Sequence, residues 1–159
     1  MGVVQFTKAN VTLTVSLSLL LYASTPTPVL AILGESSATV KHDQARLNST
    51  HRSQSEAGYT IHTLETPGLV IREYTSPDGM VFGLSWRQHT GLLNLESLFG
   101  TYYGEYSQAV AQQARQSPRF QRIETDHLIV ERGGRMGATW GRAWIVALLP
   151  PGIFKEQIQ

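Results

Sequence analysis

Three short β-rich runs joined by two tight turns dominate the middle of the sequence and constrain its fold most strongly. The runs cover residues 59–65, 69–74 and 80–86, with Pro67-Gly68 between the first two and Ser76-Pro77-Asp78-Gly79 between the last two. Proline fixes φ and glycine accepts a positive φ, so both connections favour tight turns. The region therefore predicts an antiparallel meander of three strands. The third run would place these apolar residues on one face: Met80, Phe82, Leu84 and Trp86.

An apolar stripe with helical spacing follows the meander. Apolar residues recur at intervals of three and four from Leu95 to Val110, which predicts about five helical turns. Asn94 can cap the start of this helix. Gly100 and Gly104 each weaken its middle by up to about 1 kcal/mol relative to alanine, so we expect a bend or a break into two helices.

The last third of the sequence returns to strands. Residues 127–131 and 138–146 are β-rich, and Gly133-Gly134 between them predicts a hairpin turn. The order is then β-β-β-α-β-β. It predicts a single α+β domain over residues 59–159, in which one long or broken helix packs on one face of an antiparallel sheet of about five strands.

The N-terminal 31 residues have the pattern of a secretory signal peptide. Lys8 precedes an apolar run from Val11 to Ala23, and Val29-Leu30-Ala31 supplies a cleavage site. A membrane span needs about 20 apolar residues, and Pro26 interrupts this run too early, so no span is expected after cleavage. The alternative is an uncleaved N-terminal anchor helix.

The following segment, residues 32–58, is polar and lacks a regular hydrophobic period. We expect a mobile lead-in here, with a short helix from Thr39 to Leu47 as the alternative.

The amino-acid composition excludes several classes of site and of partner. The chain has no cysteine, which excludes disulfides, thiolate metal sites and a cysteine nucleophile. It carries 13 basic and 12 acidic residues, and cleavage after Ala31 would remove Lys8 and leave a neutral protein. A neutral protein has no strong field for nucleic acid. These features predict a periplasmic or secreted bacterial protein with no nucleic-acid partner.

Several short motifs resemble a family of small secreted proteobacterial proteins that is catalogued only as a domain of unknown function. The motifs are Leu33-Gly34-Glu35, Arg72-Glu73-Tyr74 with Ser76-Pro77 and Gly79, Phe82 with Trp86, Phe99-Gly100 with Tyr102, and Gly141-Arg142-Ala143 with Leu148-Leu149-Pro150 and Gly152. The resemblance covers nearly the whole exported chain. It implies export and a single domain, and it assigns no activity or site residue.

A serine hydrolase could draw on one serine, either of two histidines and either of two acids: Ser76, His62, His127, Asp126 and Asp78. Ser76 lacks the Gly-x-Ser-x-Gly pattern of a nucleophile elbow. Its place before Pro77-Asp78-Gly79 instead predicts a hydroxyl that bonds the backbone of a turn.

The histidines and the strand carboxylates do not predict a metal site or a glycosidase more strongly than Ser76 predicts a hydrolase. The five histidines are His42, His51, His62, His89 and His127, and they lack the spacing of a metal site. A glycosidase needs two carboxylates across a cleft, and the strands offer Glu65, Glu73 and Glu131. Cross-strand ion pairs explain these acids more simply. We therefore expect no metal and no cofactor.

The aromatic residues are the most distinctive feature. Six of them fall in three elements that should meet: Trp86, Tyr102, Tyr103, Tyr106, Trp140 and Trp144. Aromatics at such spacing form a core more often than a binding surface. Trp140, Arg142 and Trp144 share one strand face, and a guanidinium between two indoles could stack internally or hold an anionic ligand. These three residues are the predicted ligand-binding residues.

Two classes of function follow. The first, which we favour, is a non-catalytic exported module that binds a protein, a peptide or an envelope component. The second is a small periplasmic hydrolase with an unrecognised Ser/His or carboxylate site. A cluster of histidine, carboxylate and hydroxyl in one cleft would favour the second.

Overall fold

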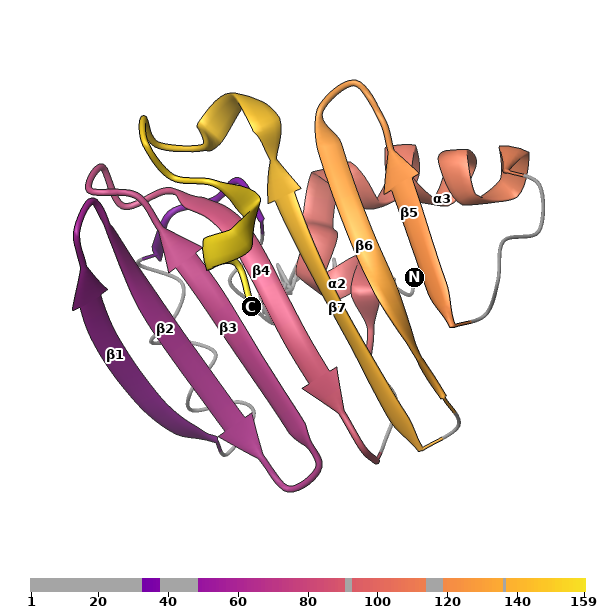
Figure 1. Ribbon diagram of the computed structural model, residues 1–159, viewed down its shortest axis with the longest axis horizontal. Coiled ribbons are helices and arrows are strands. Elements are labelled where there is room, and N and C mark those ends of the chain that lie inside the picture. Colours follow the sequence, from indigo (N-terminus) through magenta and orange to yellow (C-terminus); the bar gives the residue numbers. More distant parts are fainter. Residues whose placement is uncertain (1–32, 38–48, 91–92, 114–118, 136) are drawn as a thin grey trace, which may run out of the picture.

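The protein forms one antiparallel sheet with the α-helices on one of its faces (Figure 1). The structure is a computed structural model, and it describes residues 33–37, 49–90, 93–113, 119–135 and 137–159. Over these residues the sheet has seven strands in the order β1-β2-β3-β4-β7-β6-β5. The strands are β1 Thr50–Glu56, β2 Tyr59–Thr66, β3 Leu69–Thr75, β4 Val81–Gln88, β5 Phe120–Glu124, β6 Leu128–Arg135 and β7 Ala138–Ile145. The architecture is α+β with the sheet as its larger part.

Strands β2, β3 and β4 confirm the predicted meander. Gly68 and Gly79 adopt φ of 84° and 81° in the two turns, as the turn sequences require. The predicted face of the third strand is wrong for Phe82. The register of β3 and β4 shifts at Tyr74/Thr75, and this bulge turns Phe82 away from Leu84 and Trp86 onto the opposite face, against Tyr74.

The predicted helix is broken, as expected. It consists of α2 Leu95–Phe99, the 3-10 helix η2 Gly100–Tyr102 and α3 Tyr103–Gln112. Asn94 caps α2, since its Oδ1 accepts a hydrogen bond from Ser97 N at 3.2 Å. Gly100 has a positive φ of 51° at the break, whereas Gly104 stays inside α3. None of the helices described here has the length and apolar character needed to cross a membrane.

Two edge strands were missed, so the prediction of about five strands is wrong. Strand β1 has the sequence THRSQSE and an almost entirely exposed surface, so no hydrophobic alternation marks it. It joins the sheet by pairing with β2 along its whole length. Strand β5 is five residues long and buries one side chain, Ile123. Short polar edge strands are held by main-chain hydrogen bonds, which a hydrophobic pattern does not reveal.

The predicted hairpin turn at Gly133-Gly134 is also wrong. Both glycines belong to β6 and pair with Trp140 and Thr139 of β7. Pairing continues to Arg135 and Ala138, so the chain reverses beyond the glycines. A glycine pair within a strand leaves the sheet surface bare there.

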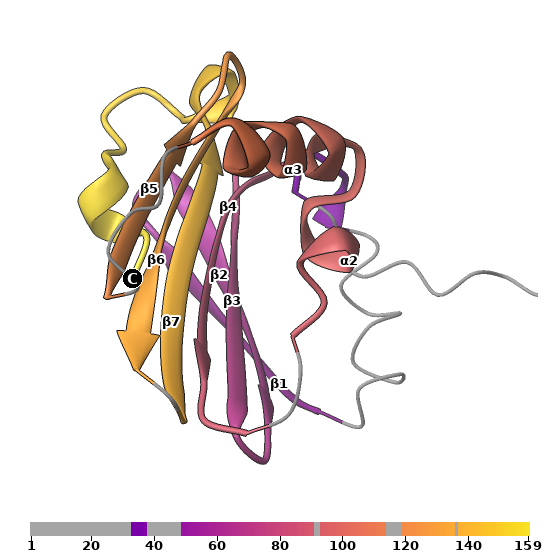
Figure 2. The same ribbon diagram turned by 90° about the vertical axis from the view of Figure 1, so that its right-hand side faces the viewer.

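The middle of the sheet is covered on both faces (Figure 2). On one face Leu98, Phe99 and Tyr106 of the helices pack against strand residues that include Leu84 and Ile145. On the other face the segment after β7, with η3 Val146–Leu148 and η4 Lys155–Gln157, folds back across the sheet. A second apolar cluster forms beneath this C-terminal segment: Tyr74, Phe82, Ile129, Trp144 and Ile158.

The polar segment 32–58 is not a uniformly mobile lead-in. Leu33 is fully buried, and its N–H donates to Leu98 O at 3.1 Å. Gly34 N donates to Val81 O at 2.8 Å, and β1 occupies the end of the segment. The alternative helix from Thr39 to Leu47 and the predicted signal peptide of residues 1–31 lie outside the described residues.

Candidate functional site

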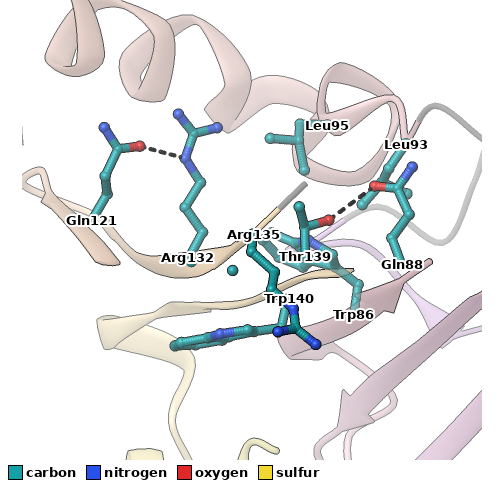
Figure 3. A pocket seen from close by; sticks show the side chains of 11 residues that line it. Trp86, Gln88, Leu93, Leu95, Gln121, Arg132, Arg135, Thr139 and Trp140 are labelled. Carbon is teal, nitrogen blue, oxygen red and sulfur yellow. Dashed lines mark hydrogen bonds between the residues drawn. The ribbon is translucent and has the colours of Figure 1, made fainter. Parts of the chain in front are cut away.

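A cleft of about 560 Å³ opens on the helix-bearing side of the sheet (Figure 3). It lies between the start of α2 and strands β4 to β7, and its main side-chain contributors are Trp86, Gln88, Leu93, Leu95, Gln121, Arg132 and Thr139. This volume is within the usual range for small-molecule sites, about 300–1,000 Å³.

A tryptophan lying on a glycine forms the floor of the cleft. Trp86 of β4 pairs with Gly141 of β7 and is 5% exposed. A Cβ at Gly141 would lie 2.1 Å from Trp86 Cζ2, so the indole occupies the space that any other residue at 141 would need. Phe99 packs on the ring with a centroid distance of 6.0 Å. The floor is therefore apolar, and its ring is held between Gly141 of the sheet and Phe99 of the helices.

The two ends of the cleft differ in polarity. Leu93 and Leu95 form an apolar wall beside the Asn94 cap. Near them the Thr139 hydroxyl is 3.3 Å from Gln88 Oε1 in a hydrogen bond that crosses from β7 to β4 (Figure 3). An amide and a hydroxyl at this position supply neutral hydrogen-bonding groups for a ligand.

Arg132 supplies a cation at the other end. Its Nε donates to Gln121 Oε1 at 2.9 Å, and its Cζ lies 5.7 Å from the centroid of the Tyr106 ring. Tyr106 is fixed by edge-on contact with Phe99 at 5.0 Å. Burial raises the pKa of Tyr106, partly offset by the charge of Arg132, so this phenol is neutral.

The lining holds one hydroxyl, that of Thr139, and no side chain of the kinds that most often act as a general acid or base. Its charged residues are Arg132 and Arg135, and no aspartate, glutamate, histidine, serine or lysine is among the residues that line it. General acid–base catalysis needs a titratable group within hydrogen-bond reach of the substrate.

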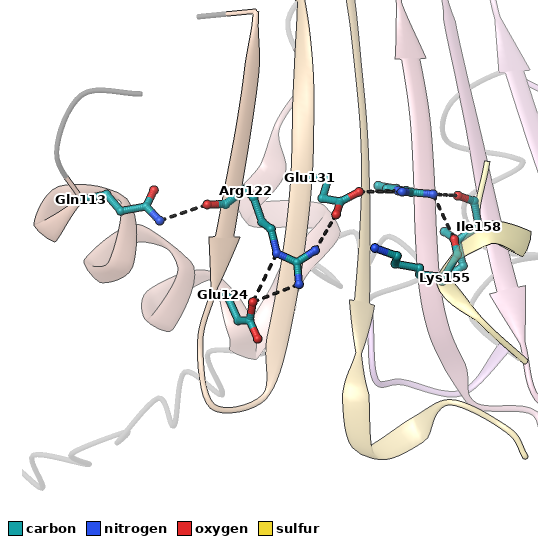
Figure 4. Close-up of polar contacts among 7 residues, drawn as sticks. Gln113, Arg122, Glu124, Glu131, Lys155 and Ile158 are labelled. Carbon is teal, nitrogen blue, oxygen red and sulfur yellow. Dashed lines mark hydrogen bonds and ion pairs between the residues drawn. The ribbon is translucent and has the colours of Figure 1, made fainter. Parts of the chain in front are cut away.

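On the opposite face, Glu131 joins two arginines from neighbouring strands (Figure 4). Arg122 NH1 lies 2.5 Å from Glu131 Oε1, and Arg142 Nε donates to Glu131 Oε2 at 2.8 Å. Burial alone would raise the pKa of Glu131, but the hydrogen bonds and charges of Arg142 and Arg122 outweigh it and hold the pKa below its ordinary value. Arg142 NH1 also donates to the main-chain oxygens of Lys155 and Ile158, so the group anchors the C-terminal segment.

The predicted ligand-binding residues share a face of β7 but differ in accessibility. Trp140 is 38% exposed and lies beside Phe120, with ring centroids 6.3 Å apart. Trp144 is 3% exposed in the apolar cluster under the C-terminal segment. Arg142 stacks on Trp144, 5.7 Å from its ring, and pairs with Glu131. Of the two arrangements considered for this arginine, the structure has internal stacking.

The candidate hydrolase residues each have a local structural partner. The Ser76 hydroxyl accepts a hydrogen bond from Met80 N at 3.2 Å in its turn, as predicted. His127 lies 3.1 Å from Glu105. His62 stacks on His51, and their ring nitrogens are 3.3 Å apart. Ser76, His62 and His127 thus each contact a different partner, so the hypothesis of a catalytic triad gains no geometric support.

The other candidates are also separated. Glu131 is occupied by two arginines, Glu73 is buried in β3, and Glu65 lies in β2. His89 is exposed, and His42 lies outside the described residues. Within the described part of the chain, no three histidine, aspartate or glutamate side chains are grouped so that they could hold a metal ion.

Sequence reasoning singled out Trp86 but missed its glycine partner and Arg132. A usable signal was present, because Gly133, Gly134 and Gly141 fall in two adjacent strands. Glycine within a strand often marks a close approach by another group.

Comparison with known proteins identifies one relationship. Residues 29–158 match a family described as "Protein of unknown function (DUF2844)", which confirms the resemblance to a domain of unknown function. No curated protein and no solved structure matches the chain.

Proposed function

The chain thus belongs to the DUF2844 family, and from the geometry of its cleft we propose that it is a non-catalytic exported domain that binds an envelope component. The ligand, or the part of it that is recognised, occupies the cleft between α2 and strands β4 to β7. Trp140 borders this cleft at the strand, but its exposed side chain lies with Arg142 and Trp144 on the opposite face of β7 (Figure 3), so the predicted binding face itself is not part of the proposed site.

The lining of the cleft is the observation that carries this proposal. A fixed indole floor, an apolar wall and a few hydrogen-bonding groups form the usual composition of a ligand site. The same lining has no carboxylate, histidine or serine, so it does not support the hydrolase alternative.

Binding at this cleft can be tested with the ¹⁵N-labelled protein and a set of small soluble fragments that covers apolar, anionic, cationic and sugar compounds. We expect shifted resonances to cluster on the indole of Trp86 and on Gly141 and Thr139. Thr139→Trp would fill the open cleft from its exposed margin and should abolish these shifts. Gln54→Trp, on exposed strand β1, is the matched control and should leave them unchanged.

Two results would contradict the proposal. One is a complete set of fragments that leaves the cleft resonances unmoved. The other is turnover of simple esters, peptides or glycosides by the purified protein that Thr139→Trp abolishes.

The exported location rests on the N-terminal pattern of Lys8, the apolar run and Val29-Leu30-Ala31. Expression of the full chain should yield an envelope protein whose intact mass begins at or near Ile32. Recovery of the uncleaved chain from the cytoplasm would contradict it.

A further inference from the structure

We infer that the cleft recognises a compact organic carboxylate, with the carboxylate on Arg132 and an apolar body on Trp86. This inference rests on the proposed binding function and specifies the chemical class of the ligand. Three features of the cleft support it: its charge, the orientation of its arginine and its apolar floor.

The charge of the cleft is one-sided. Arg132 and Arg135 line it without any acidic residue. The neighbouring arginines Arg122 and Arg142 point to the other face of the sheet and share Glu131, but none of the described carboxylates pairs with Arg132. Arg132 is only half exposed, and a partly buried cation without a counter-ion is stabilised when a ligand brings an anion. The charge of Arg132 therefore favours a ligand that carries a negative group.

The orientation of Arg132 favours a planar anion. Its Nε is already bonded to Gln121, and its guanidinium lies over the Tyr106 ring. Its NH1 and NH2 groups have no acceptor among the described residues, so the outer fork of the guanidinium is available. Two parallel N–H groups match the two oxygens of a carboxylate, and holding the fork in advance lowers the entropic cost of binding.

The remaining groups define the rest of the ligand. The indole of Trp86 over Gly141 is 5% exposed and presents only a small part of its ring to the cleft, so the partly buried Leu93 and Leu95 beside it supply the rest of the apolar surface. A ring or short aliphatic body fits this surface. The lining has no lysine, and of its two arginines Arg132 is half-buried whereas Arg135 is exposed to solvent. A single half-buried guanidinium is a poor match for the double charge and three oxygens of a phosphate monoester. A monoanionic carboxylate suits a single fork better.

The test uses four probes that share one phenyl body and differ in the polar end. They are 3-phenylpropanoate, 3-phenylpropanamide, 3-phenylpropylammonium and 2-phenylethyl phosphate, each titrated into the full exported protein while the indole resonance of Trp86 is followed. We expect the carboxylate to bind about tenfold or more tightly than the amide, because the amide keeps the body and loses the charge-assisted bonds. The ammonium probe should bind most weakly.

Variants assign the preference to one side chain. Arg132→Gln should bring the affinity for the carboxylate down to that for the amide and leave the amide affinity unchanged. Arg132→Lys keeps the charge without the fork and should retain only part of the preference. Arg52→Gln, on exposed strand β1, is the matched control and should behave as the wild type. The amide NMR spectrum of each variant shows whether it is folded. If Arg132→Gln does not fold, the affinities of Arg132→Lys for the carboxylate and the amide are compared instead.

The outcomes separate this inference from the proposed function. Equal affinity for carboxylate and amide would overturn the inference and leave the cleft as a binding site. Tighter binding of the phosphate than of the carboxylate would overturn it in favour of a phosphate ligand. A preference that survives both Arg132 variants would overturn the role of this arginine. If none of the probes and no fragment of the broader set moves the cleft resonances, both proposals fail.

Discussion

Replacing Gly141 by alanine tests whether the cleft floor depends on a bare strand surface. The new Cβ would lie 2.1, 2.5 and 2.7 Å from three atoms of the Trp86 ring. Ordinary contact begins near 3.4 Å, so the indole would have to retreat by about 1.3 Å. Phe99 lies against the ring and restricts that movement. Overpacking of this kind costs about 1–3 kcal/mol, and we expect Gly141→Ala to lower the free energy of unfolding by that amount.

The matched control is Gly104→Ala in α3. A Cβ at Gly104 meets no atom within 4 Å, so the change brings no clash. Alanine is favoured over glycine inside a helix by about 0.5–1 kcal/mol, and this variant should be more stable than the wild type. The two glycine-to-alanine changes thus have opposite predicted signs, because alanine clashes with an indole at residue 141 and is favoured by the helix at residue 104.

Urea unfolding followed by tryptophan fluorescence and far-UV circular dichroism measures both effects. A double-mutant cycle then assigns the cause: in a Trp86→Leu background the clash is gone, and Gly141→Ala should lose most of its cost, a coupling of about 1–2 kcal/mol. An unchanged midpoint for Gly141→Ala, or an equal cost in both backgrounds, would refute the argument that the indole lies on a bare glycine.

Three further changes probe other parts of the fold. Glu131→Gln removes the acceptor shared by Arg122 and Arg142 and should cost about 1–3 kcal/mol at pH 7. Because the pKa of Glu131 is lowered in the folded state, its ion pairs stabilise the protein fully above about pH 4.5 and lose this effect as the pH falls through the lowered pKa. The difference in free energy of unfolding between wild type and variant should therefore shrink in acid. Tyr106→Phe removes a buried hydroxyl that has no partner among the described residues, and the melting temperature should rise by an amount equivalent to up to about 1 kcal/mol; a clear loss would contradict this. Leu33→Ala should cost about 2–5 kcal/mol in urea unfolding because Leu33 is fully buried beside the helices, and a negligible effect would return this segment to the role of a dispensable lead-in.

The parts of the fold with a hydrophobic period were predictable from the sequence. The meander, the broken helix and the strand pair near the C-terminus all carry alternating or helical patterns, and each was found near its predicted range. The break in the helix was predictable from Gly100. The apolar stripe continues past this residue, but a glycine can adopt the positive φ that ends α2.

The edge strands and the bulge were not predictable in the same way. Strand β1 is held by main-chain pairing with β2. Its side chains are almost all exposed, so they show no alternation of polar and apolar residues that would predict a strand. The side on which Phe82 lies depends on a register shift between two strands, and alternation alone would place it with Leu84. Such features follow from the pairing of whole strands.

The candidate site shows the same division between local and long-range information. The polarity of Arg132 and the flat ring of Trp86 are visible in the sequence, but their relation depends on the order of strands in the sheet. Strand β4 pairs with β7, so Trp86 meets Gly141 across a separation of more than fifty residues, and β6 then places Arg132 next to Gly141 on the other side. Only this order puts a glycine between an indole and a guanidinium. Had β4 been an edge strand, the same residues would form neither the floor nor the cationic end of a common cleft.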